Sequence, residues 1–146
     1  MCRKSGARRK QYVPGAYVLR HTPITKGSQD KLAVLYHASL DALRRGHGSH
    51  EIWQNLADAI NVSLCMAENH NVLPTYVADI RKAQDALISC RARAHRLKRW
   101  AFNGDEIKII YRAVAIHDEQ VAFATKKQLS AALNEVNRRI EIGAIA

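Results

Sequence analysis

Hydrophobic residues recur at intervals of three and four positions along most of this chain, which is the spacing of one face of an α-helix. Short polar segments interrupt the pattern four times, so it predicts five helices. Sustained alternation of apolar and polar residues, typical of strands, does not occur. The predicted apolar stripes consist, in chain order, of Leu32, Leu35, Tyr36, Leu40 and Leu43; Trp53, Leu56, Ala57, Ile60, Leu64 and Ala67; Tyr76, Ile80, Ala83, Leu87, Cys90 and Ala94; Ile107, Ile110, Tyr111, Val114 and Val121; and Leu129, Ala132, Leu133, Val136 and Ile140.

Capping residues lie where these stripes begin and end. Asn103 is followed three positions later by Glu106, and Thr125 by Gln128, which is the spacing of a capping box. The remaining predicted boundaries are N-caps at Ser28 and Ser49, a first-turn proline at Pro74, a break at 69–71, and helix-terminating glycines at Gly46 and Gly143.

Residues 1–27 show no periodicity and contain two prolines and three glycines, so we expect an irregular N-terminal arm. Residues 28–146 form the second predicted region, a helical domain. A chain of 146 residues is long enough to bury one adequate core. The sequence therefore predicts an all-α protein, a single-domain bundle of about five helices preceded by a basic arm.

Charge is unevenly distributed along the chain. Residues 1–26 carry seven basic side chains and no acid, residues 46–80 carry four acids and no Lys or Arg, and residues 81–99 carry seven basic side chains against Asp85 alone. The net charge is +10. Concentrated positive charge attracts polyanions or acidic proteins. The residues expected to bind nucleic acid or another partner are Arg3, Lys4, Arg8, Arg9, Lys10, Arg91, Arg93, Arg96, Lys98, Arg99 and Trp100.

Helical spacing places Arg91, His95 and Lys98 on one face of the third helix, and Arg93, Arg96 and Trp100 on a neighbouring face. The indole beside the guanidiniums could stack on an unpaired base. Two other interpretations remain open. The tract could be a solvated helix end with Trp100 in the core, or it could pair with the acids of the second helix, inside one chain or between two copies; these acids are Glu51, Asp58 and Glu68.

Local signatures of catalysis or metal binding are absent from the sequence. His117, Asp118 and Glu119 are adjacent, but neighbouring helical residues point about 100° apart and cannot converge on one atom. We expect His117 to be a capped or half-buried histidine. The histidines His47 and His50 are expected to be ordinary loop residues. The sequence thus predicts neither an enzyme nor a bound cofactor or metal.

Cys2, Cys65 and Cys90 are odd in number and widely spaced, which favours a reducing compartment with Cys65 and Cys90 buried. No apolar run approaches the ~20 residues of a membrane helix, and no apolar stretch follows the N-terminal charges as in a secretory signal. We therefore expect a cytoplasmic protein that does not bind membranes.

Four short segments resemble a group of small, helical, uncharacterised proteins encoded by phages, plasmids and prophages of proteobacteria. These segments are residues 8–14 (RRKQYVP), 84–87 (QDAL), 116–120 (IHDEQ) and 129–133 (LSAAL). The resemblance implies a bacterial cytoplasm and a mobile-element context, and it supplies no catalytic residues. Accessory proteins of that kind often bind nucleic acid or host machinery, and they include inhibitors of host defence such as anti-CRISPR proteins.

The sequence predicts a non-enzymatic accessory protein whose basic surface binds nucleic acid or a nucleoprotein. The alternative is a protein-only interaction module that inhibits host machinery. A third hypothesis is a homo-oligomer in which the acidic second helix docks on the basic tract of a neighbour.

Overall fold

A computed structural model describes residues 22–143 of the chain, and within that range 81% of the residues are helical and none belongs to a strand. The all-α bundle of five helices is therefore confirmed. The helices are α2 (Lys26–Arg44), α3 (His50–Asn69), α4 (Val77–Leu97), α5 (Gly104–Phe123) and α6 (Lys126–Glu141), with a single 3-10 turn, η1 (Pro74–Tyr76), before α4.

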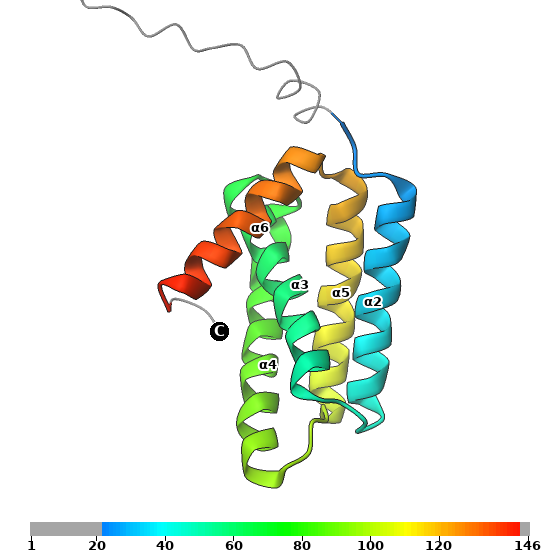
Figure 1. Ribbon diagram of the computed structural model, residues 1–146, viewed down its shortest axis with the longest axis vertical. Coiled ribbons are helices and arrows are strands. Elements are labelled where there is room, and N and C mark those ends of the chain that lie inside the picture. The colour runs from blue at the N-terminus through cyan, green and yellow to red at the C-terminus, as the bar shows by residue number, and fades with distance from the viewer. Residues whose placement is uncertain (1–21, 144–146) are drawn as a thin grey trace, which may run out of the picture.

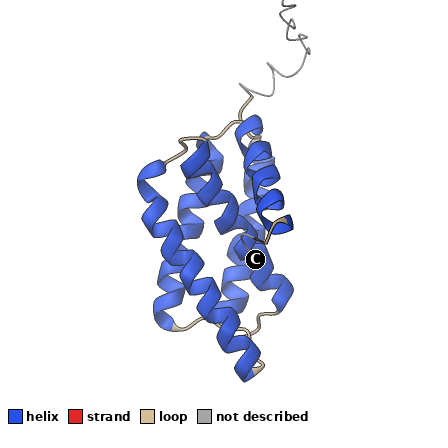
Figure 2. Cartoon of the chain, turned by 90° about the vertical axis from the view of Figure 1, so that its left-hand side faces the viewer, coloured by secondary structure: helices blue, strands red, loops and turns tan. Residues whose placement is uncertain are grey.

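Helices α2 to α5 run alternately down and up as an antiparallel four-helix bundle, and α6 crosses one half of it obliquely (Figures 1 and 2). Helix α6 packs mainly on α3, whereas α5 contacts α2, α3 and α4. The α2–α3 and α4–α5 connections lie at the same end of the bundle (Figure 1). In the range that the structure describes, no helix is long and apolar enough to cross a membrane.

Three of the four predicted N-caps are confirmed. The side chains of Ser49, Asn103 and Thr125 accept hydrogen bonds from backbone amides in the first turns of α3, α5 and α6, and the latter two complete capping boxes. The prediction for Ser28 is wrong, because Thr25 caps α2 and its hydroxyl accepts from the Ser28 amide at 3.3 Å.

The chain joins the folded body before the predicted boundary at residue 28. Ile24 is 5% exposed and packs in a core cluster with Val72 and Val136, and the Lys126 amide donates to the carbonyl of Thr22 at 2.9 Å. Any irregular arm therefore ends by residue 21. The preceding residues lie outside the described part of the chain.

The core consists of two clusters of buried side chains. The larger fills the space among α2, α3, α4 and α5, and the smaller lies between α3, α5 and α6. Cys65 and Cys90 are both 0% exposed, which confirms their predicted burial. Removal of this apolar surface from water is the dominant contribution to stability.

Four residues assigned to the apolar stripes are exposed instead. Tyr111 is 60% exposed because Ile110 takes the core position and its neighbour points about 100° away. Leu35 is 44% exposed beside the partly buried Tyr36 for the same reason. On α6, Leu133 and Ile140 are 45% and 40% exposed, since this helix packs against little besides α3.

Candidate nucleic-acid interface

The basic tract lies where α4 ends. Lys98 takes a left-handed conformation (φ 55°) that terminates the helix and turns the chain back towards α5. Trp100 then forms an isolated antiparallel bridge with Gly48, and the Phe102 amide donates to the carbonyl of Leu43 at 3.2 Å. The α4–α5 connection is therefore fastened to the α2–α3 connection, and residues far apart in sequence meet at this end.

Four aromatic rings gather beneath this connection. Trp53 is 2% exposed and donates from Nε1 to the carbonyl of Leu87 at 3.0 Å. The Trp100 ring lies 5.8 Å from that of Trp53, and the imidazoles of His50 and His95 meet Trp100 edge-on with centroids 5.5 and 5.9 Å away. Trp100 is half-buried. It is therefore neither a core residue nor an indole that projects freely into solvent.

Three cations at this end of the bundle have no carboxylate partner among residues 22–143. Arg91 lies over the Trp53 ring, with Cζ 5.3 Å from the ring centroid. Arg99 packs against the α2–α3 connection, where a Cβ added to Gly46 would lie 2.9 Å from its Cζ. Arg96 is exposed. Lys98 is also exposed and unpaired in that range. We call this surface the basic end; it consists of Arg91, Arg96, Lys98 and Arg99 and the rings of His50, His95 and Trp100.

Arg93 does not belong to the basic end, although the sequence placed it in the binding set. Its guanidinium contacts Glu106 on α5 with Nη1–Oε1 3.0 Å and Nη2–Oε2 2.5 Å, and Nη2 also donates to the carbonyl of Ala101 at 2.8 Å. These hydrogen bonds raise the pKa of Arg93 above its ordinary value. The predicted grouping of Arg93 with Trp100 is therefore wrong, because Arg93 faces α5 while Trp100 faces α3.

Among residues 22–143, no acid of α3 pairs with a cation of the 91–99 tract. Glu68 pairs with Arg81 at the other end of α4, and Asp58 accepts a hydrogen bond from Gln54 on its own helix. Within the same described range, the one carboxylate that pairs with residues 91–99 is Glu106 of α5, which was not predicted from the sequence. The neighbouring Arg44 and Arg45 both pair with Asp41, so they add little free charge to this end.

The predicted arm residues Arg3, Lys4, Arg8, Arg9 and Lys10 lie outside the described residues. Where the description begins, Thr22 is held beside the start of α6 by its hydrogen bond from Lys126. That point lies at the end of the bundle opposite the α4–α5 connection (Figure 1). The two basic segments of the sequence are therefore anchored at opposite ends of the fold.

Two side chains that could carry acid–base or nucleophilic chemistry, His117 and Cys90, are buried. His117 is 1% exposed, and neither of its ring nitrogens has a hydrogen-bond partner. Burial lowers its pKa to about 4. The prediction of a capped or half-buried histidine is therefore wrong. Burial raises the pKa of Cys90 to about 11, which leaves a thiol rather than a nucleophilic thiolate. Among residues 22–143, no three His, Cys, Asp or Glu side chains could hold a metal ion together.

The contacts of His50 with the two tryptophans were not predicted from the sequence, which indicated an ordinary loop histidine. His50 is the first residue of α3 and lies between the two tryptophans, stacked on Trp53 at 5.9 Å with 28° between the ring planes. No local signal could have revealed this, since the contact depends on the Gly48–Trp100 bridge between two distant connections.

Comparisons with family models, with curated proteins and with solved structures gave no match to this chain. The kinship with mobile-element proteins accordingly stays a prediction based on four short segments. The interpretation of the basic end depends on its own geometry.

Proposed function

We propose that this protein binds nucleic acid, alone or in a nucleoprotein, through the basic end of its bundle. One observation carries the proposal: Arg96, Lys98 and Arg99, which directly precede Trp100 in the chain, are exposed and have no carboxylate partner among residues 22–143. Charged side chains held unpaired on a rigid helix end attract a polyanion at no cost in broken ion pairs.

The chemistry of the basic end suits a phosphate backbone. Arg and Lys neutralise phosphates and release counterions, which provides affinity that falls steeply as salt rises. Arg91 and Arg99 are held by Trp53 and Gly46, so their guanidiniums are partly oriented before a ligand arrives. Exposed rings beside such cations also offer a surface on which an unpaired base can stack.

The salt dependence of binding tests this proposal. We would titrate a labelled oligonucleotide, single-stranded and duplex, with the full chain and follow fluorescence anisotropy between about 50 and 200 mM salt. The triple variant Arg96→Ala, Lys98→Gly, Arg99→Ala should reduce the slope of log K against log salt by about 2–3, since each lost phosphate contact removes just under one.

A matched triple variant controls for net charge. Lys31, Lys82 and Lys127 are exposed, make no ion pair among the described residues and lie away from the basic end, so replacing them by Ala should leave most of the slope intact. Equal losses in both triple variants would contradict a localised interface. No binding by the wild-type chain at about 50 mM salt would contradict nucleic-acid binding itself and favour the protein-only module.

A further inference from the structure

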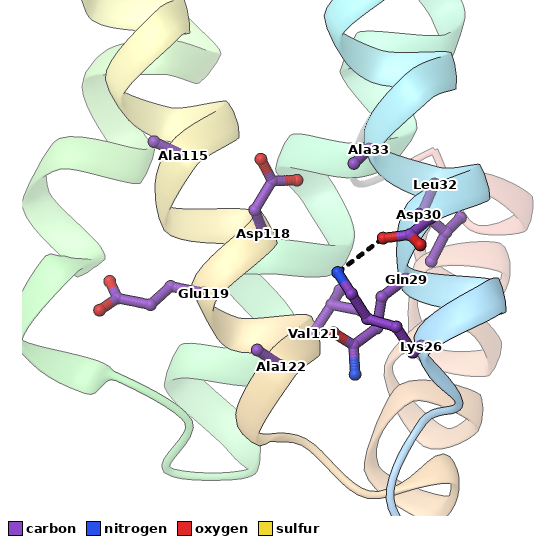
Figure 3. Close-up of a pocket in the computed structure, with 10 residues that line it drawn as sticks. All are labelled: Lys26, Gln29, Asp30, Leu32, Ala33, Ala115, Asp118, Glu119, Val121 and Ala122. Carbon is purple, nitrogen blue, oxygen red and sulfur yellow. Dashed lines mark hydrogen bonds and ion pairs between the residues drawn. The ribbon is translucent and has the colours of Figure 1, made fainter.

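A groove runs between the first half of α2 and the last half of α5 (Figure 3). It has a volume of about 440 Å³. The groove exists because Ala33 on α2 faces Ala115 and Ala122 on α5, and these short side chains leave the space between the helices unfilled. Leu32 and Val121 add further apolar lining, so the groove offers an uncharged floor.

The rim of this groove is acidic, although the protein carries a net charge of +10. Three carboxylates line it, those of Asp30, Asp118 and Glu119, against the single cation Lys26. Asp118 points into the groove and contacts His37 Nε2 at 2.6 Å, while Glu119 lies at the edge with its carboxylate directed away from α2 (Figure 3). The groove therefore suits a ligand with basic and apolar side chains.

The Lys26–Asp30 ion pair, which runs along α2 at one side of the groove, is no obstacle to such a ligand (Figure 3). Its nitrogen and oxygen lie 2.7 Å apart, but the two side chains are 80% and 59% exposed. Exposed pairs at this spacing contribute little to stability. An incoming guanidinium can therefore replace the lysine at Asp30.

The chain itself supplies a segment of matching chemistry. Residues 1–21 contain six Arg and Lys side chains and no acid, together with the apolar pairs at 12–13 and 18–19. This segment ends at Thr22, four residues before Lys26, the first residue of the groove. At ~3.3 Å per residue it can extend ~70 Å, many times the ~10 Å that seven residues of α2 span.

We propose that the α2–α5 groove binds the N-terminal segment of its own chain, residues 1–21, with apolar side chains over the alanines and basic side chains at Asp30 and Asp118. The proposal requires no nucleic acid and is independent of the proposed function. The acidic groove and the basic segment are complementary in charge. The attachment at Thr22 also keeps the local concentration of the segment near the groove high.

Paramagnetic relaxation in the full-length chain tests the assignment. A nitroxide is attached at Ala16→Cys in a Cys2→Ser background, where Cys65 and Cys90 are 0% exposed and escape labelling. At low salt, the amide signals of Ala33, Ala115 and Ala122 should broaden. The broadening should disappear at high salt, because screening weakens the attraction between exposed charges.

Matched charge reversals complete the test. Asp30→Lys should abolish the broadening, whereas Asp85→Lys, the same change at an exposed acid on α4, should leave it intact. Broadening of another surface, or none at low salt, would overturn the proposal. So would broadening that appears only when spin-labelled chains are mixed with isotope-labelled, spin-free chains, because the segment would then come from a second copy.

Discussion

The guanidinium of Arg93 on α4 and the carboxylate of Glu106 on α5 form a bidentate ion pair, and Glu106 is only 6% exposed. The same carboxylate accepts the Asn103 amide at 2.9 Å, so it closes the capping box of α5 while it holds α4. One side chain thus fixes both the start of α5 and its contact with the basic tract. The Arg93 guanidinium is therefore occupied by an ion pair within the fold.

Replacing Glu106 by Ala should lower the free energy of unfolding by about 3 kcal/mol, because it removes the half of the capping box that Glu106 supplies and leaves Arg93 half-buried without its partner. Glu106→Gln should lose less, about 1–2 kcal/mol, since glutamine also completes a capping box. Urea unfolding followed by circular dichroism measures both. Equal losses in the two variants would show that the cap contributes nothing here.

Acid should destabilise the protein through His117. Its folded pKa of about 4 lies below the ordinary 6.5, with desolvation as the cause and the neighbouring Asp118 opposing it. The unfolded chain therefore binds more protons between these values, and stability falls as pH drops from about 6.5 to about 4, by up to about 3 kcal/mol.

The variant His117→Leu isolates this effect. It removes the titration and two unpartnered ring nitrogens while it keeps an apolar side chain against Tyr36, whose ring lies 5.2 Å from that of His117. Unfolding free energies at pH 5 and pH 7 should differ less in this variant than in the wild-type chain. An unchanged difference would assign the acid sensitivity to other groups.

Gly48→Ala should disturb the basic end. An added Cβ would lie 2.8 Å from the carbonyl oxygen of Trp100, a backbone atom that can move only with the connection. We expect a loss of about 1–3 kcal/mol and a change in tryptophan fluorescence. Gly104→Ala is the matched control, since nothing lies within 4 Å of its new Cβ, and it should leave stability and fluorescence nearly unchanged.

Lys98→Gly should separate binding from stability. Lys98 has φ 55°, a conformation that costs a residue with a Cβ about 1 kcal/mol and costs glycine almost nothing. The variant should therefore unfold at higher urea concentration while it binds nucleic acid with a smaller salt slope. A loss of both stability and binding would indicate that the lysine supports the fold.

Helix boundaries were predictable where the signal is local. A capping box needs only four consecutive residues, so Asn103 with Glu106 and Thr125 with Gln128 could be identified from the sequence. Ser28 failed because Thr25, three residues earlier, offers the same hydroxyl. The choice between them depends on Ile24, which is buried only through contacts with distant residues of α3 and α6.

The site was predictable only in part. The cations of the tract could be located from the sequence, because a cluster of Lys and Arg residues is recognisable without knowledge of the fold. It could not separate Arg93 from Arg96, since that distinction depends on Glu106 arriving from another helix. It also could not place His50 beside Trp100, which requires the connections that contain Gly48 and Trp100 to meet.

The anchorage of Thr22 beside Lys126 sets a minimum length for any ligand that touches both basic segments near their attachment points. The 19 residues of α2 separate the two ends by roughly 28 Å at 1.5 Å per residue. Base pairs stack every 3.4 Å, so a rigid duplex would need about eight of them to bridge that distance. For contacts close to Thr22, shorter oligonucleotides should occupy one end at a time, and a plot of affinity against duplex length should show a step near that value; contacts made farther along residues 1–21 should remove the step.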